Sequence, residues 1–263
     1  CHPTRALPAM PNAESFLADW PAIDGIEGWL DHPAAALMDA LLAAQEDLQV
    51  AAQGLLEIGT WKGRSAALMA RHLRPDEDLL LVDAWLKTDA IGEGIGRLFH
   101  DRPRPGRIRL LQGESLSLGK HLAPDRMYRY IHIDGEHTAA ALRNDLVLAC
   151  RHLAPAGLIV VDDIFNALYP QLTRELFTFL AQEGRGMACL LIGFNKACLC
   201  RTKTMDSYGD WVFRHINAAM VQRGIKVSLC RTTDRVEWPG YSLVPDQGKA
   251  HRGPDYQEDY LRP

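Results

Sequence analysis

The chain has 263 residues, of which 47% are hydrophobic and 24% are charged, as in an ordinary globular protein. This length suits one large α/β domain or two small ones. The net charge is −4 and the sequence has no long basic run, which argues against nucleic acid as the main partner, because phosphates are bound by clustered lysine and arginine. No apolar run approaches the roughly 18 residues of a membrane span. No signal peptide is recognisable either, so we expect a cytoplasmic protein without membrane contact.

The first segment, residues 1–50, is expected to combine an irregular arm with a helix. Several prolines indicate that the arm holds no more than a short helix near 15–20. Leucines at helical spacing predict a longer helix over 34–52. The apolar side chains of Trp20 and Trp29 predict that the arm covers the substrate or contacts a second subunit, which leaves a homo-oligomer open.

From residue 51 to residue 245, short apolar runs alternate with helical patterns. Strands are expected over 55–58, 79–82, 108–111, 127–133 and 158–161, and helices over 65–72, 91–100, 139–152, 172–182 and 211–223. This alternation predicts an α/β fold with a Rossmann-like doubly wound sheet and helices on both faces. The sheet is expected to be mostly parallel, with an antiparallel strand late in the chain.

The last part of the chain gives weaker patterns. The segments 189–194 and 197–200 are expected to form a strand pair or one bent strand, and 226–230 and 241–244 are β-like. The segment "LAPAG", from Leu153 to Gly157, is expected to be a turn. Residues 246–263 are polar and are expected to form a tail.

Two further stretches leave alternatives open. "IGEGIGR", residues 91–97, is expected to be a lid or an ordinary mobile segment. "TKTMDSYGDW", residues 202–211, is expected to be a wall of the substrate site or an exposed connection. Trp61 and Trp85 either stack on a ligand or pack in the core.

Acidic residues stand at the ends of five consecutive predicted strands: Glu57, Asp83, Glu114, Asp134 and the pair Asp162–Asp163. Open α/β sheets bind ligands beyond the carboxyl ends of their strands, near the point where the strand order reverses. We therefore expect these side chains to surround one ligand site. The simpler interpretation of any one of them is a helix cap or a solvated turn.

The turn "EIGTWKG" predicts what the ligand is. Gly59 and Gly63 let the backbone pass close to a bound molecule. The turn is neither a GxGxxG fingerprint nor a P-loop, so a dinucleotide or a triphosphate is disfavoured. Asp83, at the end of the next strand, can accept hydrogen bonds from both hydroxyls of a ribose. These features suit a nucleoside ligand that has no pyrophosphate.

The carboxylates of Asp134, Asp162 and Asp163 are expected to converge on one cation, because like charges repel unless a counter-ion lies among them. Oxygen ligands favour Mg²⁺, Ca²⁺ or Mn²⁺ over zinc. Asp162 and Asp163 can share one ion only if the strand has already ended, since side chains alternate faces along a strand. His137 is a candidate general base, and its simpler interpretation is a turn residue.

The motifs "LLEIGTWKGRSA", "LLLVDAW", "IRLLQGES", "YIHIDGEHTAAALRNDL" and "LAPAGLIVVDD" resemble, in order and spacing, those of class I S-adenosylmethionine-dependent methyltransferases. The resemblance covers roughly residues 50–200. It implies that the cofactor is S-adenosylmethionine, bound by Glu57, Gly59, Thr60, Gly63, Ser65, Asp83, Gly113, Glu114, Ser115 and Asp134. Within this set, Asp83 would hold the ribose, and residues 113–115 would lie beside the adenine.

The sequence is most similar to the small-molecule O-methyltransferases that depend on a metal. By this resemblance, Asp134, Asp162 and Asp163 would be the ligands of Mg²⁺ or another divalent cation, and Asp134 and His137 would be catalytic. Catechol-type enzymes have a lysine base where this chain has His137, whereas the enzymes that modify antibiotic sugars have a histidine there. A sugar of a natural product is therefore the favoured acceptor.

We therefore predict an O-methyltransferase that moves a methyl group from S-adenosylmethionine to a hydroxyl of a small molecule, with help from a cation and His137. One alternative is a metal-independent methyltransferase with His137 alone as base. A second is a non-catalytic protein that keeps the fold and the cofactor. A nucleotide-dependent oxidoreductase is disfavoured because GxGxxG is absent.

Overall fold

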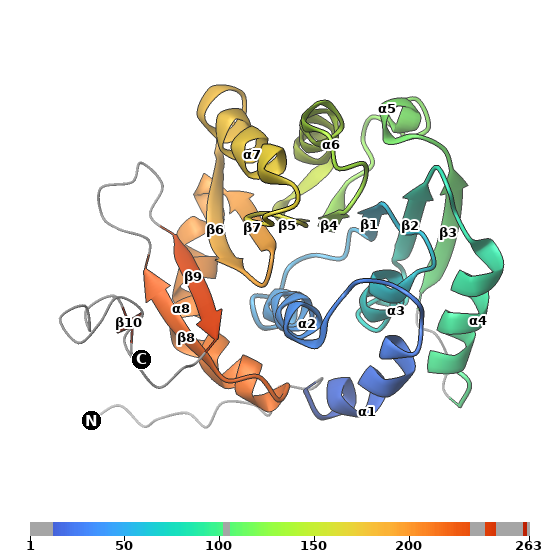
Figure 1. Ribbon diagram of the computed structural model, residues 1–263, viewed down its shortest axis with the longest axis horizontal. Coiled ribbons are helices and arrows are strands. Elements are labelled where there is room, and N and C mark those ends of the chain that lie inside the picture. The colour runs from blue at the N-terminus through green and yellow to red at the C-terminus, as the bar shows by residue number, and fades with distance from the viewer. Residues whose placement is uncertain (1–12, 102–105, 232–239, 246–259, 262–263) are drawn as a thin grey trace.

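The computed structural model describes residues 13–101, 106–231, 240–245 and 260–261 (Figure 1). Its helices are α1 (Ala13–Asp24), α2 (His32–Asp47), α3 (Arg64–Ala70), α4 (Thr88–Leu98), α5 (Ser115–Leu118), α6 (Ala139–His152), α7 (Pro170–Gln182) and α8 (Met205–Gln222). Its strands are β1 (Leu55–Ile58), β2 (Asp78–Asp83), β3 (Arg107–Gln112), β4 (Tyr128–Ile133), β5 (Leu153–Val161), β6 (Met187–Gly193), β7 (Lys196–Arg201), β8 (Val227–Arg231), β9 (Tyr241–Pro245) and β10 (Tyr260–Leu261). A short 3₁₀ helix, Thr202–Thr204, precedes α8.

All described strands join in one sheet with the order β10-β8-β9-β6-β7-β5-β4-β1-β2-β3. The strands from β3 to β5 are parallel, and β7 pairs antiparallel with both β5 and β6. The strand order reverses between β1 and β4, so the two halves of the chain diverge from that point. This topology confirms the predicted doubly wound sheet with an antiparallel late strand, and it sets the expected ligand site at the ends of β1 and β4.

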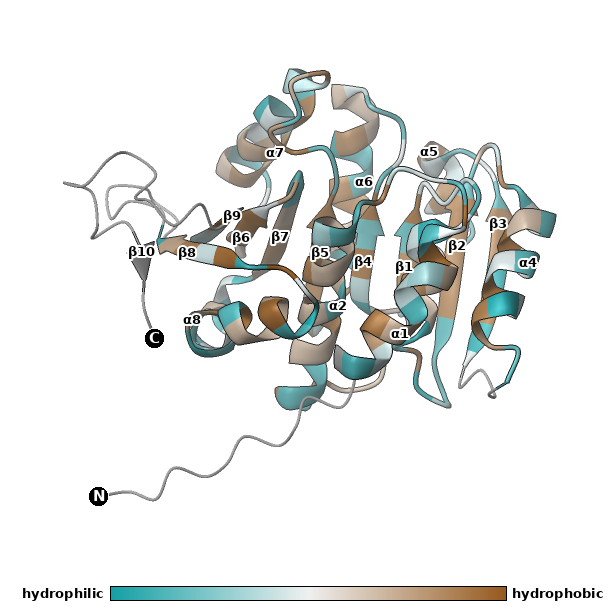
Figure 2. Cartoon of the chain, turned by 60° about the horizontal axis from the view of Figure 1, so that its bottom comes forward, coloured by the Kyte–Doolittle hydropathy of each residue, from teal (hydrophilic) through white to brown (hydrophobic). Residues whose placement is uncertain are grey.

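The helices form two layers, with α5, α6 and α7 on one face of the sheet and α1, α2, α3 and α8 on the other (Figure 1). All four residues of β1 and all six of β4 are buried, as expected for strands covered on both sides. The edge strand β3 is largely exposed. Figure 2 shows hydrophobic and hydrophilic stretches alternating along α4, which fits a helix with one buried face.

The predicted bounds of 55–58 and 139–152 are those of β1 and α6. Other predictions were wrong in ways that packing explains. The segment "LAPAG" is the first part of β5 rather than a turn, because Leu153 already pairs with Tyr128 of β4. Residues 91–97 lie within α4, which confirms the helix expected over 91–100, and Gly94 of this helix packs against Ile26.

The segment 202–211 is neither a substrate wall nor an exposed connection. It contains a 3₁₀ turn and the start of α8, and both of its aromatic residues are buried. The hydroxyl of Tyr208 donates to the carbonyl of Ala156 at 2.7 Å, and Trp211 Nε1 donates to Asp47 at 2.9 Å. These bonds fix α8 against α2 and β5.

The described part of the N-terminal segment is more regular than predicted. The short helix expected near 15–20 is the 12-residue α1, and Phe16 and Ile23 of this helix are fully buried in the main core. Residues 1–12 and most of the expected tail, 246–259 and 262–263, lie outside the described residues. Tyr260 and Leu261 pair with β8 as an additional strand. No helix in the described part of the chain is long and apolar enough to cross a membrane.

Candidate active site

The turns that follow β1 and β4 touch at the point where the strand order reverses. Gly59 has φ +91°, and a Cβ atom added there would lie 1.7 Å from the carbonyl oxygen of Asp134. The backbone N–H of Asp134 donates to the carbonyl of Ile58 at 2.7 Å. Position 59 therefore accepts only glycine, for reasons of both conformation and space.

The turn after β1 leads directly into α3. Gly63 has φ +87° and is the N-cap of α3. Thr60 and Ser65 are buried beside it, and the Thr60 hydroxyl is buried without a hydrogen-bond partner. A buried hydroxyl without a partner is costly, which suggests that a ligand completes this turn.

Asp83, the last residue of β2, is held by backbone groups on both of its carboxylate oxygens. The N–H of Trp61 donates to Oδ2 at 2.7 Å, and the N–H of Trp85 donates to Oδ1 at 2.6 Å. Asp83 thus fits both interpretations offered by the sequence, the cap and the ligand-binding residue. Its side chain caps two turns, and the residue also lines a cavity. Each carboxylate oxygen retains capacity for a second hydrogen bond.

A cavity of about 460 Å³ opens over these turns and brings most of the predicted cofactor residues together. The predicted residues that line it are Gly59, Asp83, Gly113, Glu114, Ser115 and Asp134. Its apolar walls come from Trp29, Trp61, Trp85 and Leu116. A smaller cavity of about 210 Å³ shares part of this lining and adds Thr60, Gly63 and Ser65. Their combined size is within the range of small-molecule and cofactor sites.

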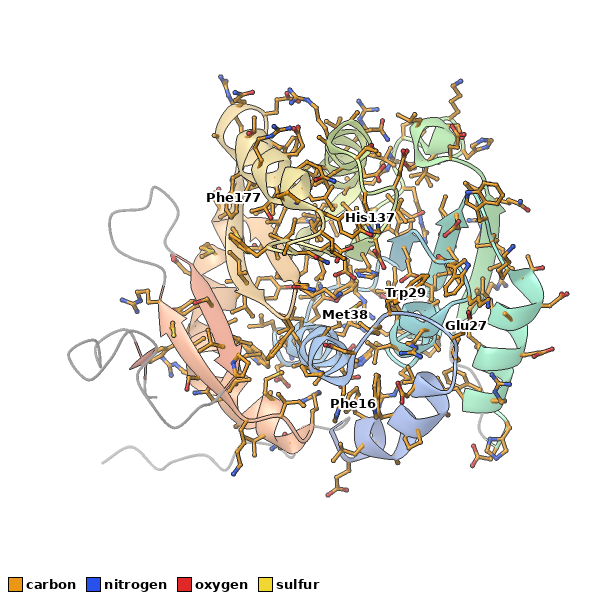
Figure 3. All side chains as sticks on the ribbon, in the orientation of Figure 1. Phe16, Glu27, Trp29, Met38, His137 and Phe177 are labelled. Carbon is orange, nitrogen blue, oxygen red and sulfur yellow. The ribbon has the colours of Figure 1, made fainter. Side chains whose placement is uncertain are left out.

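Trp29, which the sequence analysis assigned to a covering arm, lies at the rim of both cavities. It comes from the segment between α1 and α2 (Figure 3). Its ring stacks on that of Trp61 at 4.5 Å and is 87% exposed. An exposed tryptophan at a cavity rim commonly contacts a ligand.

Glu57 is the one predicted cofactor residue that does not line either cavity. It is fully buried in β1, and its Oε1 lies 2.9 Å from Nδ1 of His132, which is its direct neighbour on β4. Burial alone would lower the pKa of His132, but the hydrogen bond and the charge of Glu57 outweigh burial and raise it. The Nε2 atom of His132 is buried without a hydrogen-bond partner, and His132 lines the smaller cavity. Sequence reasoning missed His132, because a histidine inside an apolar run reads as an ordinary strand residue.

The acidic pair after β5 satisfies the condition stated from the sequence. Strand β5 ends at Val161, and Asp163 has φ +57°, so the two side chains no longer alternate as on a strand. Oδ1 of Asp162 accepts a hydrogen bond from the backbone N–H of Asp163 at 2.7 Å. Oδ1 of Asp163 accepts one from Asn166 at 2.6 Å.

His137 lies between two of the predicted carboxylates. Its Nε2 is 2.9 Å from Oδ2 of Asp163 and 3.6 Å from Oδ1 of Asp134, and its ring stacks on Tyr169 at 4.2 Å. Hydrogen bonding to Asp134 and then to Asp163 raises the pKa of His137 to about 10. Burial, together with the neighbouring charge of Asp162, raises the pKa of Asp134 to about 6. The two carboxylates thus favour the protonated form of His137.

Asp162 points instead to a lysine that the sequence analysis did not single out. Lys196, the first residue of β7, forms an ion pair with Oδ2 of Asp162, and its side chain is only 4% exposed. A charged residue at the start of an otherwise apolar strand was the only signal in the sequence. Buried lysines are rare unless they are paired.

The predicted set of three carboxylates is divided into two possible metal groups. Within the described residues, one group is His132, Asp134 and Asp162, and the other is Asp134, His137 and Asp163. In each group the ligand atoms lie within 4.8 Å of one another. Asp134 belongs to both groups, and each group adds a histidine nitrogen to the oxygen ligands that were expected.

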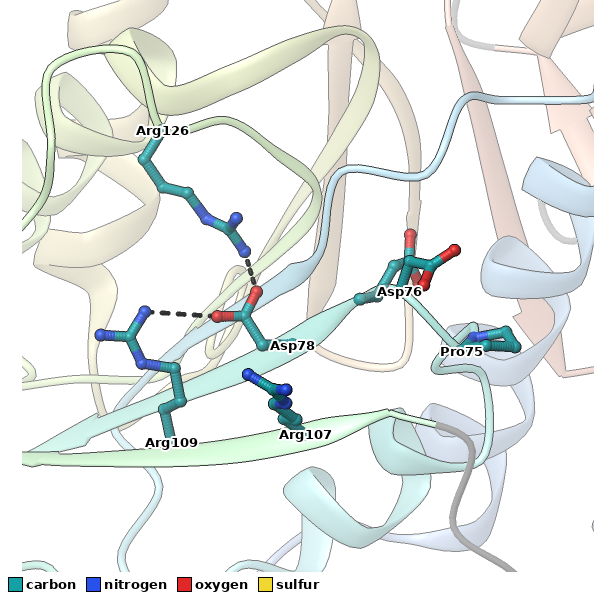
Figure 4. Close-up of a pocket in the computed structure, with 7 residues that line it drawn as sticks. Pro75, Asp76, Asp78, Arg107, Arg109 and Arg126 are labelled. Carbon is teal, nitrogen blue, oxygen red and sulfur yellow. Dashed lines mark hydrogen bonds and ion pairs between the residues drawn. The ribbon is translucent and has the colours of Figure 1, made fainter.

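A further cavity of about 420 Å³ lies at the opposite, amino ends of β2 and β3 (Figure 4). Two of its three arginines are engaged with the protein itself, because Asp78 forms ion pairs with both Arg126 and Arg109. Glu77, which also lines it, is bound to the buried Arg129. Much of the charge of this cavity is thus compensated internally, and the cavity lies away from the predicted residues.

Comparisons with known proteins agree with this geometry. Residues 56–164 match the model of a family described as a methyltransferase domain. No curated protein matches the sequence at a significant level. Among solved structures, an O-methyltransferase from Bacillus cereus in complex with SAH is 19% identical, with a TM-score of 0.51 and coverage of 74% of this chain and 92% of that chain.

Two further structures show the same fold. The O-methyltransferase NovP is 14% identical, with a TM-score of 0.52 and coverage of 65% of this chain and 80% of that chain. CalS11, a TDP-rhamnose 3′-O-methyltransferase of calicheamicin biosynthesis, is 13% identical, with a TM-score of 0.50 and coverage of 76% and 98%.

The family match indicates a methyltransferase domain over residues 56–164, and the chain has the fold of solved O-methyltransferases, one of them in complex with SAH. The methyltransferase domain of the family model begins within β1 and ends just beyond Asp163. It therefore includes every residue that the sequence analysis assigned to the cofactor or the cation.

Proposed function

We propose that this protein is an S-adenosylmethionine-dependent methyltransferase that transfers a methyl group to a hydroxyl of a small molecule, and that a sugar of a natural product is the acceptor. The observation that carries this proposal is the convergence of Asp134, His137 and Asp163 beside the cavity formed by the first three strand ends. The O-methyltransferases NovP and CalS11 share the fold, and the description of CalS11 names a sugar nucleotide as substrate, which supports a sugar acceptor.

The cofactor would lie across the two joined cavities. Asp83 would accept the ribose hydroxyls, and Gly113, Glu114 and Ser115 would lie beside the adenine. The methionine end would then occupy the smaller cavity, where the unpartnered polar atoms of Thr60 and His132 are available to it. Glu57 would act indirectly, by orienting His132.

The donor set at the ends of β4 and β5 fits a divalent cation. Asp134 and Asp163 provide carboxylate oxygens that lie close to one another. Nε2 of His137 lies between them, so this position already stabilises a positive charge. Asp162 would join them only if it gave up its ion pair with Lys196. Mg²⁺ or Mn²⁺ suits such ligands, and when bound it would lower the pKa of the acceptor hydroxyl.

The chemical step needs an acceptor for one proton. The bond between sulfur and the methyl carbon breaks as the bond between the methyl carbon and the acceptor oxygen forms, and the hydroxyl proton leaves. His137, once released from its ion pairs, would take this proton at Nε2, while Tyr169 holds its ring in place. The aligned donor and acceptor supply the rest of the rate enhancement.

One observation favours the metal-independent alternative. The three carboxylates are already neutralised by side chains of the protein, since His137 faces Asp134 and Asp163, and Lys196 faces Asp162. In this case His137 would work as the base without a cation, after losing the proton that its two carboxylate neighbours favour.

The N-terminal and C-terminal parts would have separate tasks. We propose that residues 51–245 form the methyltransferase domain and that residues 1–50 form a cover over the acceptor site. Trp29 would be the residue of this cover that contacts the acceptor at the cavity rim. A role of this segment in a homo-oligomer stays a second proposal, and the tail 246–263 has no role assigned to it.

A methyl-transfer assay on a panel of glycosides tests the proposal. Protein freed of metal by chelation is mixed with isotope-labelled S-adenosylmethionine and assayed with and without added Mg²⁺. We expect transfer to a sugar hydroxyl that depends on the cation and is lost in the variant Asp163→Asn. Transfer that is insensitive to chelation would favour the alternative, and transfer only to non-hydroxyl acceptors would refute O-methylation.

A further inference from the structure

A row of alternating charges lies beneath the proposed catalytic centre. Four neighbouring strands, β1, β4, β5 and β7, each contribute one residue at or just beyond the strand: Glu57, His132, Asp162 and Lys196. Glu57 lies 2.9 Å from Nδ1 of His132, whose Nε2 is 3.9 Å from Oδ2 of Asp162. The same Oδ2 atom of Asp162 forms the ion pair with Lys196.

The backbone around Lys196 holds the ammonium group in place. β6 and β7 form a hairpin whose two turn residues, Phe194 and Asn195, have φ values of 51° and 60°. The carbonyl of Asn195 accepts a hydrogen bond from the N–H of Ile164 at 2.9 Å, which ties the hairpin to the segment that carries the acidic pair. The backbone of Lys196 is thereby held next to the acidic pair.

The pairing is tight because both groups are removed from water. The side chain of Lys196 is 4% exposed and that of Asp162 is 15% exposed. An ammonium group buried to this degree is stable only beside an opposite charge. Removing one partner from such a pair leaves an uncompensated charge, which then attracts another ion of the missing sign.

We propose that Lys196 is the resident counter-ion of Asp162, and that its ammonium group occupies the place on this carboxylate that a divalent cation would need. Lys196 is thus a positioning residue that weakens cation binding at the strand ends. The cation site of the wild-type protein consists of Asp134 and Asp163, without Asp162. This inference deepens the proposed function and rests on the cation site assigned there.

Binding of Mn²⁺, measured by electron paramagnetic resonance of the free ion, tests this inference without an acceptor. The variant Lys196→Met keeps the length of the side chain and removes its charge. We expect it to bind Mn²⁺ at least tenfold more tightly than the wild-type protein, because Asp162 becomes a free ligand. Lys196→Arg keeps the charge and should bind Mn²⁺ as the wild type does, and so should Lys226→Met, which removes an exposed lysine.

Two further variants assign any gain to Asp162. In Lys196→Met/Asp162→Asn the tighter binding should be lost. In Asp162→Asn alone, Mn²⁺ should bind no more tightly than to the wild type, because the Lys196 ammonium keeps its charge and loses its partner. If Lys196→Met fails to fold, Lys196→Gln, which also removes the charge, is measured in its place. The inference is overturned if the folded variant without the lysine charge binds Mn²⁺ no more tightly than the wild type, or if Asp162→Asn binds it more tightly.

Calorimetric titration of the same proteins with S-adenosylhomocysteine separates this inference from the proposed function. If the wild-type protein does not bind S-adenosylhomocysteine, the proposed function is refuted, whereas the Mn²⁺ result still stands. Normal binding together with unchanged Mn²⁺ affinity in Lys196→Met would refute only the role of Lys196.

Discussion

Asp83 is the residue on which we expect cofactor binding to depend most directly, because its two oxygens organise two turns and the residue lines the larger cavity. The N–H groups of Trp61 and Trp85 hold the carboxylate at 2.7 and 2.6 Å. A ligand hydroxyl that reaches this carboxylate therefore meets an acceptor that is already oriented. Hydrogen bonds to a charged acceptor are about twice as strong as those between neutral groups.

The first prediction concerns the variant Asp83→Asn. We expect it to bind S-adenosylhomocysteine at least tenfold more weakly, because the amide is uncharged and only one of its two polar atoms can accept a hydrogen bond. Calorimetric titration measures this directly. Asp89→Asn, in the first turn of α4, is the matched control and should bind normally. Unchanged affinity in Asp83→Asn would exclude Asp83 as the ribose ligand.

A second prediction at this scale concerns Asp145, a buried carboxylate on α6 that is only 1% exposed and has one oxygen without a partner. Burial raises its pKa from 3.8 to about 6. A raised acidic pKa means that the folded state binds the proton more tightly than the unfolded state. The contribution to stability is therefore fully present below pH 3.8 and is lost as the pH rises through about 6.

The variant Asp145→Asn removes the free-energy cost of burying the charged carboxylate at high pH. At pH 8 we expect it to raise the free energy of unfolding, by an amount of the order of 3 kcal/mol for a shift of this size. At pH 4 the two proteins should be nearly equally stable, because Asp145 is then largely protonated in the folded protein. Urea unfolding at both pH values measures the difference. An equal effect at both values would show that charge is not the cause.

At the scale of elements, the segment between α1 and α2 is fixed to the methyltransferase domain by Arg64, in addition to an ion pair between Glu27 and Lys62. Arg64, the first residue of α3, donates to the carbonyls of Ile26 at 2.5 Å, Leu30 at 3.0 Å and Asp24 at 2.9 Å. This segment carries Trp29 to the rim shared by the two cavities. The segment is thus positioned as part of the binding site rather than as a loose arm.

The third prediction compares two exposed tryptophans of the rim. Trp29→Ala should raise KM for the acceptor more than it weakens binding of S-adenosylhomocysteine, because Trp29 belongs to the proposed acceptor cover. Trp85→Ala should weaken binding of S-adenosylhomocysteine more than it raises KM for the acceptor. Trp85 lies two residues after Asp83 and lines only the larger of the two cavities. Steady-state kinetics and calorimetry distinguish the two. The same preference in both variants would contradict the proposed role of Trp29.

The elements themselves show why some features were predictable from the sequence and others were not. The strands β1 and β4 are buried on both faces, so their apolar runs were clear. The start of α8 was missed because "TKTMDSYGDW" is polar in sequence, while its Tyr208 and Trp211 are buried through contacts with α2 and β5 that are distant along the chain.

The same reason explains which site residues were found. Acidic residues at strand ends follow from local pattern and topology, so the sequence located Asp83, Asp134 and Asp163. Their charge partners depend on which strands become neighbours. His132 and Lys196 acquire their roles only because β4 lies beside β1 and β7 lies beside β5. No local pattern in a single sequence shows which strands will be neighbours in the sheet.

At the scale of the whole molecule, stability and chemistry are located at opposite ends of the sheet. The amino end is held together by Arg129, the second residue of β4, which is fully buried. Its guanidinium donates to both oxygens of Glu77 at 2.6 and 2.8 Å, to Gln45 of α2 at 2.7 Å and to the carbonyl of His72 at 2.6 Å. One side chain thus joins α2, the end of α3 and the start of β2.

The last prediction follows from this arrangement. Arg129→Met should lower the free energy of unfolding by about 3–5 kcal/mol, because Glu77 is then left buried without its counter-ion. Arg109→Met is the matched control. The Arg109 side chain is 64% exposed and its ion pair with Asp78 spans 3.3 Å, so its loss should cost about 1 kcal/mol or less. Urea unfolding at neutral pH measures both changes.

Calorimetry on the folded fraction of Arg129→Met tests whether the amino end of the sheet affects ligand binding at the carboxyl end. The dissociation constant for S-adenosylhomocysteine should stay within a factor of two of the wild-type value, because Arg129 contacts none of the residues that line the cofactor cavities. A large loss of affinity in protein that is still folded would mean that the amino end of the sheet controls the geometry of the turns after β1 and β4. In that case the buried ionic network would have to be counted as part of the binding machinery.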